Sequence, residues 1–216
     1  MMLTWPVATV GWVSNIVQQA EASQGRINEF LQEKPHIENT CLSSTPIFGD
    51  IRFDHVTFTY PDTQVTALKD ISFHIPKGKS IAIIGRTGSG KSTILELITR
   101  MYDVEQGQIL IDERNIKDLN LNDLRKSISV VPQDCFLFSD TIAHNIKFGK
   151  PQASEAEVIQ VAKLAQVHDN IMDFKDNYQT VLGERGITLS GGQRQRVSIA
   201  RALLKEAQIY LFDDCL

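Results

Sequence analysis

Residues 85–93 combine closely spaced glycines with a lysine and two hydroxyls, in the order Gly-Arg-Thr-Gly-Ser-Gly-Lys-Ser-Thr. Glycine lets the main chain wrap closely around an anion, because a Cβ atom would collide or forbid the required backbone angles. The N–H groups at a helix start then attract phosphate. This G-x-x-x-x-G-K-[ST] pattern predicts a triphosphate site, and the plain alternative is a glycine-rich turn before a helix. The predicted nucleotide-binding residues are Gly85, Arg86, Thr87, Gly88, Ser89, Gly90, Lys91, Ser92 and Thr93.

Two side chains of this loop have expected roles in binding a nucleotide with its cation. Lys91 is placed to reach the β- and γ-phosphates, and the Ser92 hydroxyl to ligate Mg²⁺. A second metal ligand is expected at Asp213, which ends the apolar run Ile-Tyr-Leu-Phe over residues 209–212. A strand beside the loop would bring this carboxylate to the metal, directly or through water.

A second glycine-rich helix start lies at residues 189–193. A serine and two glycines there would expose N–H groups to an anion, and Ser190 also suits the N-cap position. The plain interpretation is an ordinary capped helix. The residues of this motif are Leu189, Ser190, Gly191, Gly192 and Gln193.

The elements that must position these motifs can be read from apolar patterns and turns. Residues 51–60 and 67–75 are β-rich runs, and residues 80–84 form a short continuous apolar strand of the kind buried on both faces of a sheet. Helices are expected from about 91 to 102, after a capping box at Ser154 and Glu157, and from about 191 to 205. A strand over 208–212 closes the chain.

The N-terminal 34 residues indicate one long helix that stops before Pro35. No charged side chain occurs in the first twenty residues, but polar residues dilute this stretch, so it is marginal as a membrane span. It also lacks the basic start and cleavage site of a signal peptide. We favour the end of a longer membrane helix with a cytoplasmic extension. Residues 35–48 indicate a linker.

The overall composition excludes some classes of function. The chain has 216 residues, with 22 basic and 26 acidic side chains and a net charge of −4, so no basic excess points to nucleic acid. The length suits one domain, or one domain with an appendage. Cys41, Cys135 and Cys215 are far apart, which indicates neither a disulfide framework nor a zinc site.

The glycine-rich loop, the motif at 189–193 and the strand ending in Asp213 together resemble the ATP-binding cassette (ABC) family. That resemblance implies an α/β fold with a RecA-like core, an antiparallel β-subdomain and an α-helical subdomain, here with an incomplete C-terminus. It implies a partial nucleotide-binding domain over 49–216, with the helical subdomain about 134–195. It also implies that the signature at 189–193 faces a nucleotide held by a second cassette.

Other positions carry roles only through this resemblance. Tyr60 matches the aromatic residue that stacks on adenine, although a strand aromatic in the core is the plain alternative. Gln133 matches the glutamine that helps to hold Mg²⁺ and senses the coupling helices of the transmembrane domain. Residues 136–146, and residues 181–186 with Glu184, are similar to exporter loops near those helices. The resemblance therefore implies an exporter half-subunit that couples ATP binding and hydrolysis to transport, located at the cell (inner) membrane with its cassette on the cytoplasmic side.

Two features depart from the family pattern. Asp214 stands where the family usually has a catalytic glutamate, and the shorter side chain would fall short of the attacking water by about an ångström. We expect a weak site, paired in a heterodimer with a competent one. The sequence ends at Leu216, before the position of the family's switch histidine. The expectation is therefore a cassette truncated at both ends, whose alternative function is ATP binding without turnover. A soluble DNA-repair cassette is disfavoured by the N-terminal helix.

Overall fold

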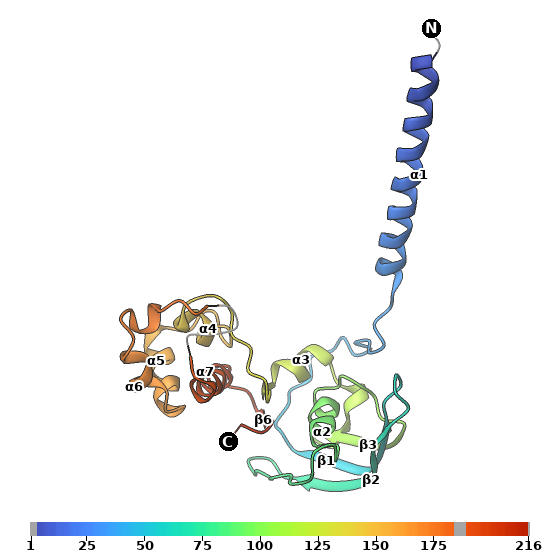
Figure 1. The fold of residues 1–216 in the computed structure, drawn as a ribbon. Helices are drawn as coiled ribbons and strands as arrows, with labels where there is room; N and C mark the ends of the chain where they lie inside the picture. The colour runs from blue at the N-terminus through green and yellow to red at the C-terminus, as the bar shows by residue number, and fades with distance from the viewer. Residues whose placement is uncertain (1–3, 184–188, 216) are drawn as a thin grey trace. The chain divides into compact units, whose positions relative to one another are not determined.

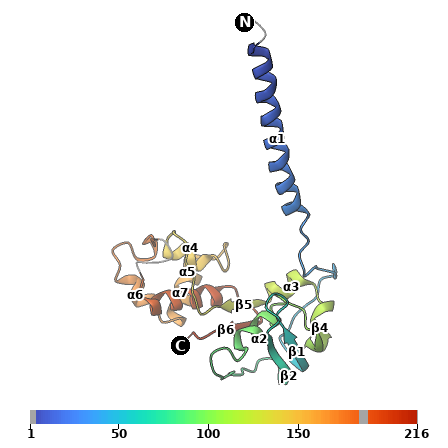
Figure 2. The same ribbon diagram turned by 45° about the vertical axis from the view of Figure 1, so that its right-hand side comes forward.

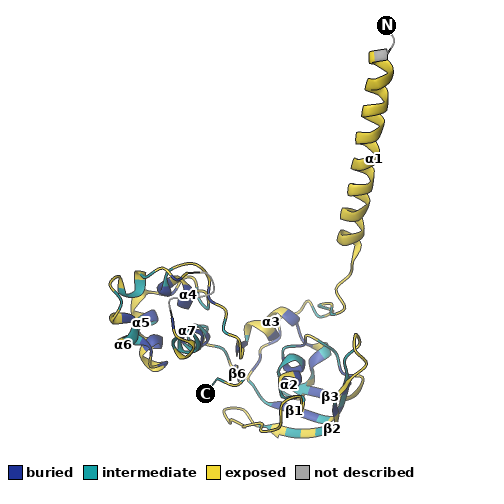
Figure 3. Ribbon diagram, viewed as in Figure 1, coloured by how far each residue is buried: buried dark blue, intermediate teal, exposed yellow. Residues whose placement is uncertain are grey.

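A computed structural model describes residues 4–183 and 189–215, and the first of its two compact units, residues 1–38, contains one helix (Figure 1). This helix, α1 (Thr4–Gln32), ends shortly before Pro35, as expected. Its residues from 5 to 32 are exposed along the whole length (Figure 3). Within the described part of the chain, no helix combines the length and the apolar character that crossing a bilayer requires.

The second unit, residues 39–216, begins with an antiparallel sheet in the strand order β2-β1-β3-β4 (Figure 2). In β1, Phe53 and Phe58 are buried because alternate side chains face the core, and a bulge at His55 shifts the register between them. Phe53 stacks on Phe73 of the neighbouring strand. The strands are β1 (Ile51–Thr59), β2 (Thr66–Ile75), β3 (Gln106–Ile111) and β4 (Arg114–Asn115).

The strand expected at residues 80–84 is wrong, because this segment has no regular structure and its residues are exposed. A run of β-branched residues becomes a strand only where neighbouring strands take its backbone hydrogen bonds. In the described residues the parallel pair β5 (Ile128–Val131) and β6 (Ile209–Phe212) forms a sheet of its own, in register from Ile128↔Ile209 to Val131↔Phe212, without segment 80–84.

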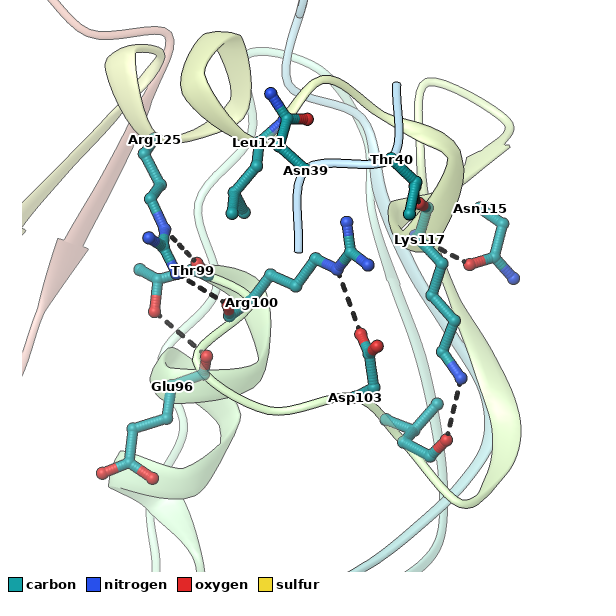
Figure 4. Close-up of polar contacts among 11 residues, drawn as sticks. Asn39, Thr40, Glu96, Thr99, Arg100, Asp103, Asn115, Lys117, Leu121 and Arg125 are labelled. Carbon is teal, nitrogen blue, oxygen red and sulfur yellow. Dashed lines mark hydrogen bonds and ion pairs between the residues drawn. The ribbon is translucent and has the colours of Figure 1, made fainter. Parts of the chain in front are cut away.

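Helix α2 (Lys91–Ile98) follows the glycine-rich loop and is shorter than expected. It stops before residue 102 because Arg100 adopts a left-handed φ of 49°. Arg125 donates to the carbonyl oxygens of Thr99 and Arg100, which satisfies the end of the helix (Figure 4). Arg125 belongs to α3 (Leu121–Lys126), which follows the short 3₁₀ helix η1 (Ile116–Asp118).

The linker region from residue 39 to 48 has no helix or strand and is tied to the start of α3. Asn39 accepts a hydrogen bond from the Leu121 amide (Figure 4), and the Thr45 amide donates to Asp123. Because Asn120 also caps α3 with its own side chain, this helix start is held from both sides.

A group of helices encloses a second apolar core, in which Ile142, Ile146, Ile171 and Val197 are fully buried. The capping box of Ser154 and Glu157 is confirmed. Ile171 lies in a separate helix from the one that begins after this box. The elements are α4 (Ile142–Lys147), α5 (Glu155–Leu164), α6 (His168–Met172), η2 (Asn177–Gln179) and α7 (Gly191–Leu204). A helical subdomain bounded at 134–195 stays a prediction.

Candidate functional site

The glycine-rich loop reaches α2 through two glycines in left-handed backbone conformations, Gly88 (φ 77°) and Gly90 (φ 84°). A Cβ atom on Gly90 would lie 2.6 Å from the carbonyl oxygen of Ala67 and 2.8 Å from Leu68 Cδ2, so this position excludes a side chain. Gly90 is the N-cap of α2, and no side chain caps the helix there. The first N–H groups of α2 are therefore left for an anion.

Lys91 and Ser92 project from the first turn of α2 and contact the main chain of the loop and the end of β6. Lys91 Nζ donates to the carbonyl oxygens of Gly85 and Arg86, each at 3.0 Å, so its charge lies over the loop. Ser92 Oγ donates to Asp213 Oδ2 at 2.9 Å. The structure thus brings together two of the three expected metal ligands, Ser92 and Asp213, which are 121 residues apart in the sequence.

Asp213 and Asp214 follow β6 directly and turn toward different partners. The Asp213 amide continues the β5–β6 pairing by donating to the Val131 carbonyl, and its carboxylate meets Ser92. Asp214 instead accepts a hydrogen bond from Gln133 Nε2 at 3.1 Å, while Gln195 Nε2 donates to its carbonyl oxygen. Gln133 therefore lies beside Asp214, in a polar cleft of about 710 Å³ that the first turn of α7 also lines.

Tyr60 follows β1 and lies half-buried against α2. Its hydroxyl oxygen lies 2.8 Å from Thr93 Oγ1 and 2.8 Å from Glu96 Oε2. Burial raises the pKa of Tyr60 above its ordinary value, and the hydrogen bond to Glu96 raises it further, so the phenol stays protonated at neutral pH. Sequence reasoning anticipated Tyr60 and Thr93 but missed Glu96, for which no local motif gives a signal.

The signature residues form the start of α7. Leu189 is buried, and Ser190 caps the helix by accepting from the Gln193 amide, while Gln193 Oε1 accepts from the Ser190 amide at 2.9 Å. A Cβ atom added to Gly191 or Gly192 would meet no atom of the described residues within 4 Å. These two glycines therefore face open space, unlike Gly90.

A family model described as ABC transporter matches residues 68–216, more than half of the chain. The chain belongs to the ABC transporter family. It is thus an ATP-binding domain, and the expected cassette fold is confirmed by a solved structure, that of a bacterial Atm1-family ABC exporter with ATP bound. That structure is 37% identical, with a TM-score of 0.90 over 99% of this chain and 38% of its own.

Curated relatives of this ABC cassette lead to the same family. YknU of Bacillus subtilis, named an uncharacterized ABC transporter ATP-binding protein, is 44% identical over 98% of this chain and 37% of its own length. The multidrug resistance-like ATP-binding protein MdlA of Escherichia coli is 43% identical over 100% of this chain and 36% of its own length. The cassette chain thus spans little more than a third of these relatives.

The exporter-like loops of the cassette are only partly described. Glu184, together with the rest of 184–188, lies outside the described residues. The earlier loop exposes Phe136 and Phe138, and the ring of Phe138 also packs on that of exposed Phe148 at the end of α4. The expected contact of these loops with coupling helices stays a prediction.

Arg201 of α7 contacts the loop that carries Phe136 and Phe138, and sequence reasoning missed this arginine. Its guanidinium donates to the carbonyl oxygens of Asn145 and Phe136 and to Asn145 Oδ1, and it lies over the rings of Phe138 and Phe148. Burial lowers the pKa of this arginine below its ordinary value. An available signal was its place four residues after Val197, on the apolar stripe of the helix, where a charge needs partners.

Proposed function

We propose that this chain is the ATP-binding part of an ABC exporter, in which ATP binding and hydrolysis drive movement of a substrate across a membrane. The observation that supports it most strongly is the 2.9 Å contact between Ser92 Oγ and Asp213 Oδ2. This contact places a hydroxyl and a carboxylate beside Lys91 and the uncapped N–H groups at the start of α2, the helix that follows the glycine-rich loop (the P-loop, residues 85–93). Phosphoryl chemistry requires this arrangement.

The residues present fit Mg²⁺ as the cation that accompanies ATP. Ser92, Asp213 and the side-chain oxygen of Gln133 are hard oxygen donors, the type that Mg²⁺ prefers. In the described residues no cluster of three His, Cys, Asp or Glu side chains forms an all-protein metal cage. That agrees with a cation held by few protein ligands and by phosphate oxygens. When bound, the ion neutralises charge that develops on the β- and γ-phosphate oxygens.

The partner of this cassette is proposed to be a second ABC half-transporter. The open space around Gly191 and Gly192 supports this proposal, because their backbone is accessible to a nucleotide held by another cassette. A heterodimer with one weak and one competent site is the finer form of the proposal. We place the cassette on the cytoplasmic side of the cell membrane, with Phe136, Phe138 and Phe148 facing the coupling helices of the transmembrane domain.

ATP binding is tested by titrating the purified chain with a fluorescent ATP analogue in the presence of Mg²⁺. Lys91→Ala should weaken binding by at least about 100-fold, because it removes the charge over the phosphate loop. Lys163→Ala, at an exposed position of α5, is the matched control and should bind like the unchanged chain. Equal binding by the Lys91→Ala variant would refute a phosphate-binding role for this loop.

The role of the metal ligands is tested by repeating the titration with and without Mg²⁺. Asp213→Asn and Ser92→Ala should reduce the gain in affinity that Mg²⁺ gives, while binding of metal-free ATP changes little. A full Mg²⁺ effect in both variants would contradict the proposed metal site. The alternative of a cassette that binds ATP without turnover has no support from the related proteins.

A further inference from the structure

The hydroxyl of Tyr60 is held between two side chains of the P-loop helix. Both Thr93 Oγ1 and Glu96 Oε2 lie 2.8 Å from it. An ionised carboxylate only accepts hydrogen bonds, so the single phenol proton goes to Glu96 and the Thr93 hydroxyl donates to the Tyr60 oxygen. The tyrosine is thus both donor and acceptor in one short chain of hydrogen bonds.

Neighbouring aromatic rings fix the other end of the same side chain. The Tyr60 ring lies 5.0 Å from Phe58 at an interplanar angle of 77°, and 5.5 Å from Tyr102 at 87°. Such edge-to-face contacts favour one ring orientation. Because Tyr60 has two main side-chain torsions, packing at the ring and hydrogen bonds at the hydroxyl together define its position.

Arg100 and Arg125, drawn beside Glu96 in Figure 4, make their contacts with other groups. Arg100 Nε is bound to Asp103 at 3.0 Å, and Arg125 donates to main-chain carbonyl oxygens. Figure 4 shows the side chain of Glu96 pointing away from these residues. Its position in α2, three residues after Thr93, puts both side chains on one face of the helix that starts at Lys91.

We propose that Glu96 is a positioning residue for the nucleotide base, acting through the hydroxyl of Tyr60. The inference rests on the proposed function, in which Tyr60 stacks on adenine and the P-loop holds the phosphates. Thr93 and Glu96 belong to α2, the helix that follows the glycine-rich loop. Their hydrogen bonds therefore fix the Tyr60 ring at a set distance from the loop that binds the phosphates. A ring ordered before binding loses less conformational entropy when ATP arrives.

The test compares two ligands that share phosphates but differ in the base. In the full chain, Glu96→Ala should weaken ATP binding by about 3- to 10-fold, as expected for one lost hydrogen bond, and should leave binding of inorganic tripolyphosphate unchanged. Glu96→Gln retains a carbonyl acceptor and should restore ATP binding to within about twofold of the unchanged chain. Glu105→Ala, at an exposed carboxylate before β3, is the control and should change the binding of neither ATP nor tripolyphosphate.

A double-mutant cycle separates positioning from a general effect on the helix. Tyr60→Phe keeps the ring but removes the hydroxyl, so it should match Glu96→Ala, and the double variant should be no weaker than either single variant. Equal losses for ATP and tripolyphosphate, additive losses in the cycle, or unchanged ATP binding would each overturn the proposal. Failure of the unchanged chain to bind either ligand would instead refute the proposed function itself.

Discussion

The two glycine-rich helix starts of this cassette are built in opposite ways. At α2 the N-cap is Gly90, with φ 84° and no side-chain cap, and its neighbours exclude a Cβ atom. At α7 the N-cap is Ser190, with φ −63° and a complete capping box with Gln193. Gly191 and Gly192 there have open surroundings.

This difference separates a requirement of the fold from a requirement of a ligand. Gly90 is needed by the chain itself, because the loop could not pass Ala67 and Leu68 with a side chain there. The glycines of α7 are not required by any contact in the described structure. This agrees with the proposal that the glycine-rich loop at 85–93 binds nucleotide within its own chain and that the start of α7 receives one from a second cassette.

The largest effect is expected for Gly90→Ala. The added methyl group would strain a left-handed residue by about 1–3 kcal/mol and would press on the Ala67 carbonyl, which is main chain and cannot move aside easily. We expect a clearly lower midpoint of thermal unfolding and a loss of ATP affinity of more than about 100-fold. Calorimetry and nucleotide titration measure the two effects. A variant that folds and binds ATP normally would contradict the claim that the fold requires glycine at position 90.

The next effect concerns Asp214, whose main chain is held by Gln195 of α7 while Asp213 is held by Ser92 of α2. Asp214→Glu adds the methylene that the resemblance to the family calls for. If Asp214 is a base set about an ångström too far from the water, its replacement should raise ATP turnover by up to about 100-fold. The assay is phosphate release by the cassette within its complete transporter, with Asp134→Glu in the same cleft as control. Brisk turnover before the change, with no gain after it, would disprove the weak-site hypothesis.

Gly192→Ala should sharpen the contrast with Gly90. Because nothing lies near the added Cβ atom and alanine favours helix, stability should rise by about 0.5 kcal/mol and ATP binding to the single chain should not change. ATP-driven pairing of cassettes should weaken about tenfold if a nucleotide from the partner approaches this backbone. Analytical ultracentrifugation with ATP measures the pairing, and undisturbed pairing would remove the proposed role of the open surface.

Features determined by local chemistry could be predicted from the sequence. The capping box at Ser154 and Glu157 and the start of α7 at Gly191 need only neighbouring residues, and both are present. The family fold followed from short motifs in the same way. The strand at 80–84 failed because a strand depends on partners elsewhere in the chain, and apolar residues alone do not supply them.

The contacts of the site illustrate the same limit. The hydrogen bond between Gln133 and Asp214 joins residues 81 positions apart, and only the family pattern indicated that either residue mattered. Glu96 and Arg201 had no expected role, since their partners are Tyr60, 36 residues before Glu96, and Asn145 of α4, 56 residues before Arg201. The end of α2 was misplaced because helix propensity does not reveal the left-handed turn at Arg100.

The smallest effect is expected from comparing the two serines at these helix starts. Ser190→Ala removes the side-chain cap of α7 and should cost about 1 kcal/mol, which lowers the midpoint of unfolding by about 2–4 °C for a chain of this size. Ser92→Ala removes an exposed hydroxyl that contacts Asp213 and caps nothing, so the midpoint should stay within about 1 °C while the Mg²⁺ effect on ATP binding falls. Thermal unfolding and nucleotide titration of both variants therefore give opposite pairs of results. If either variant changed both the midpoint of unfolding and the Mg²⁺ effect on ATP binding, or if the two results were exchanged, the capping and metal-binding roles would not be divided between these two helices.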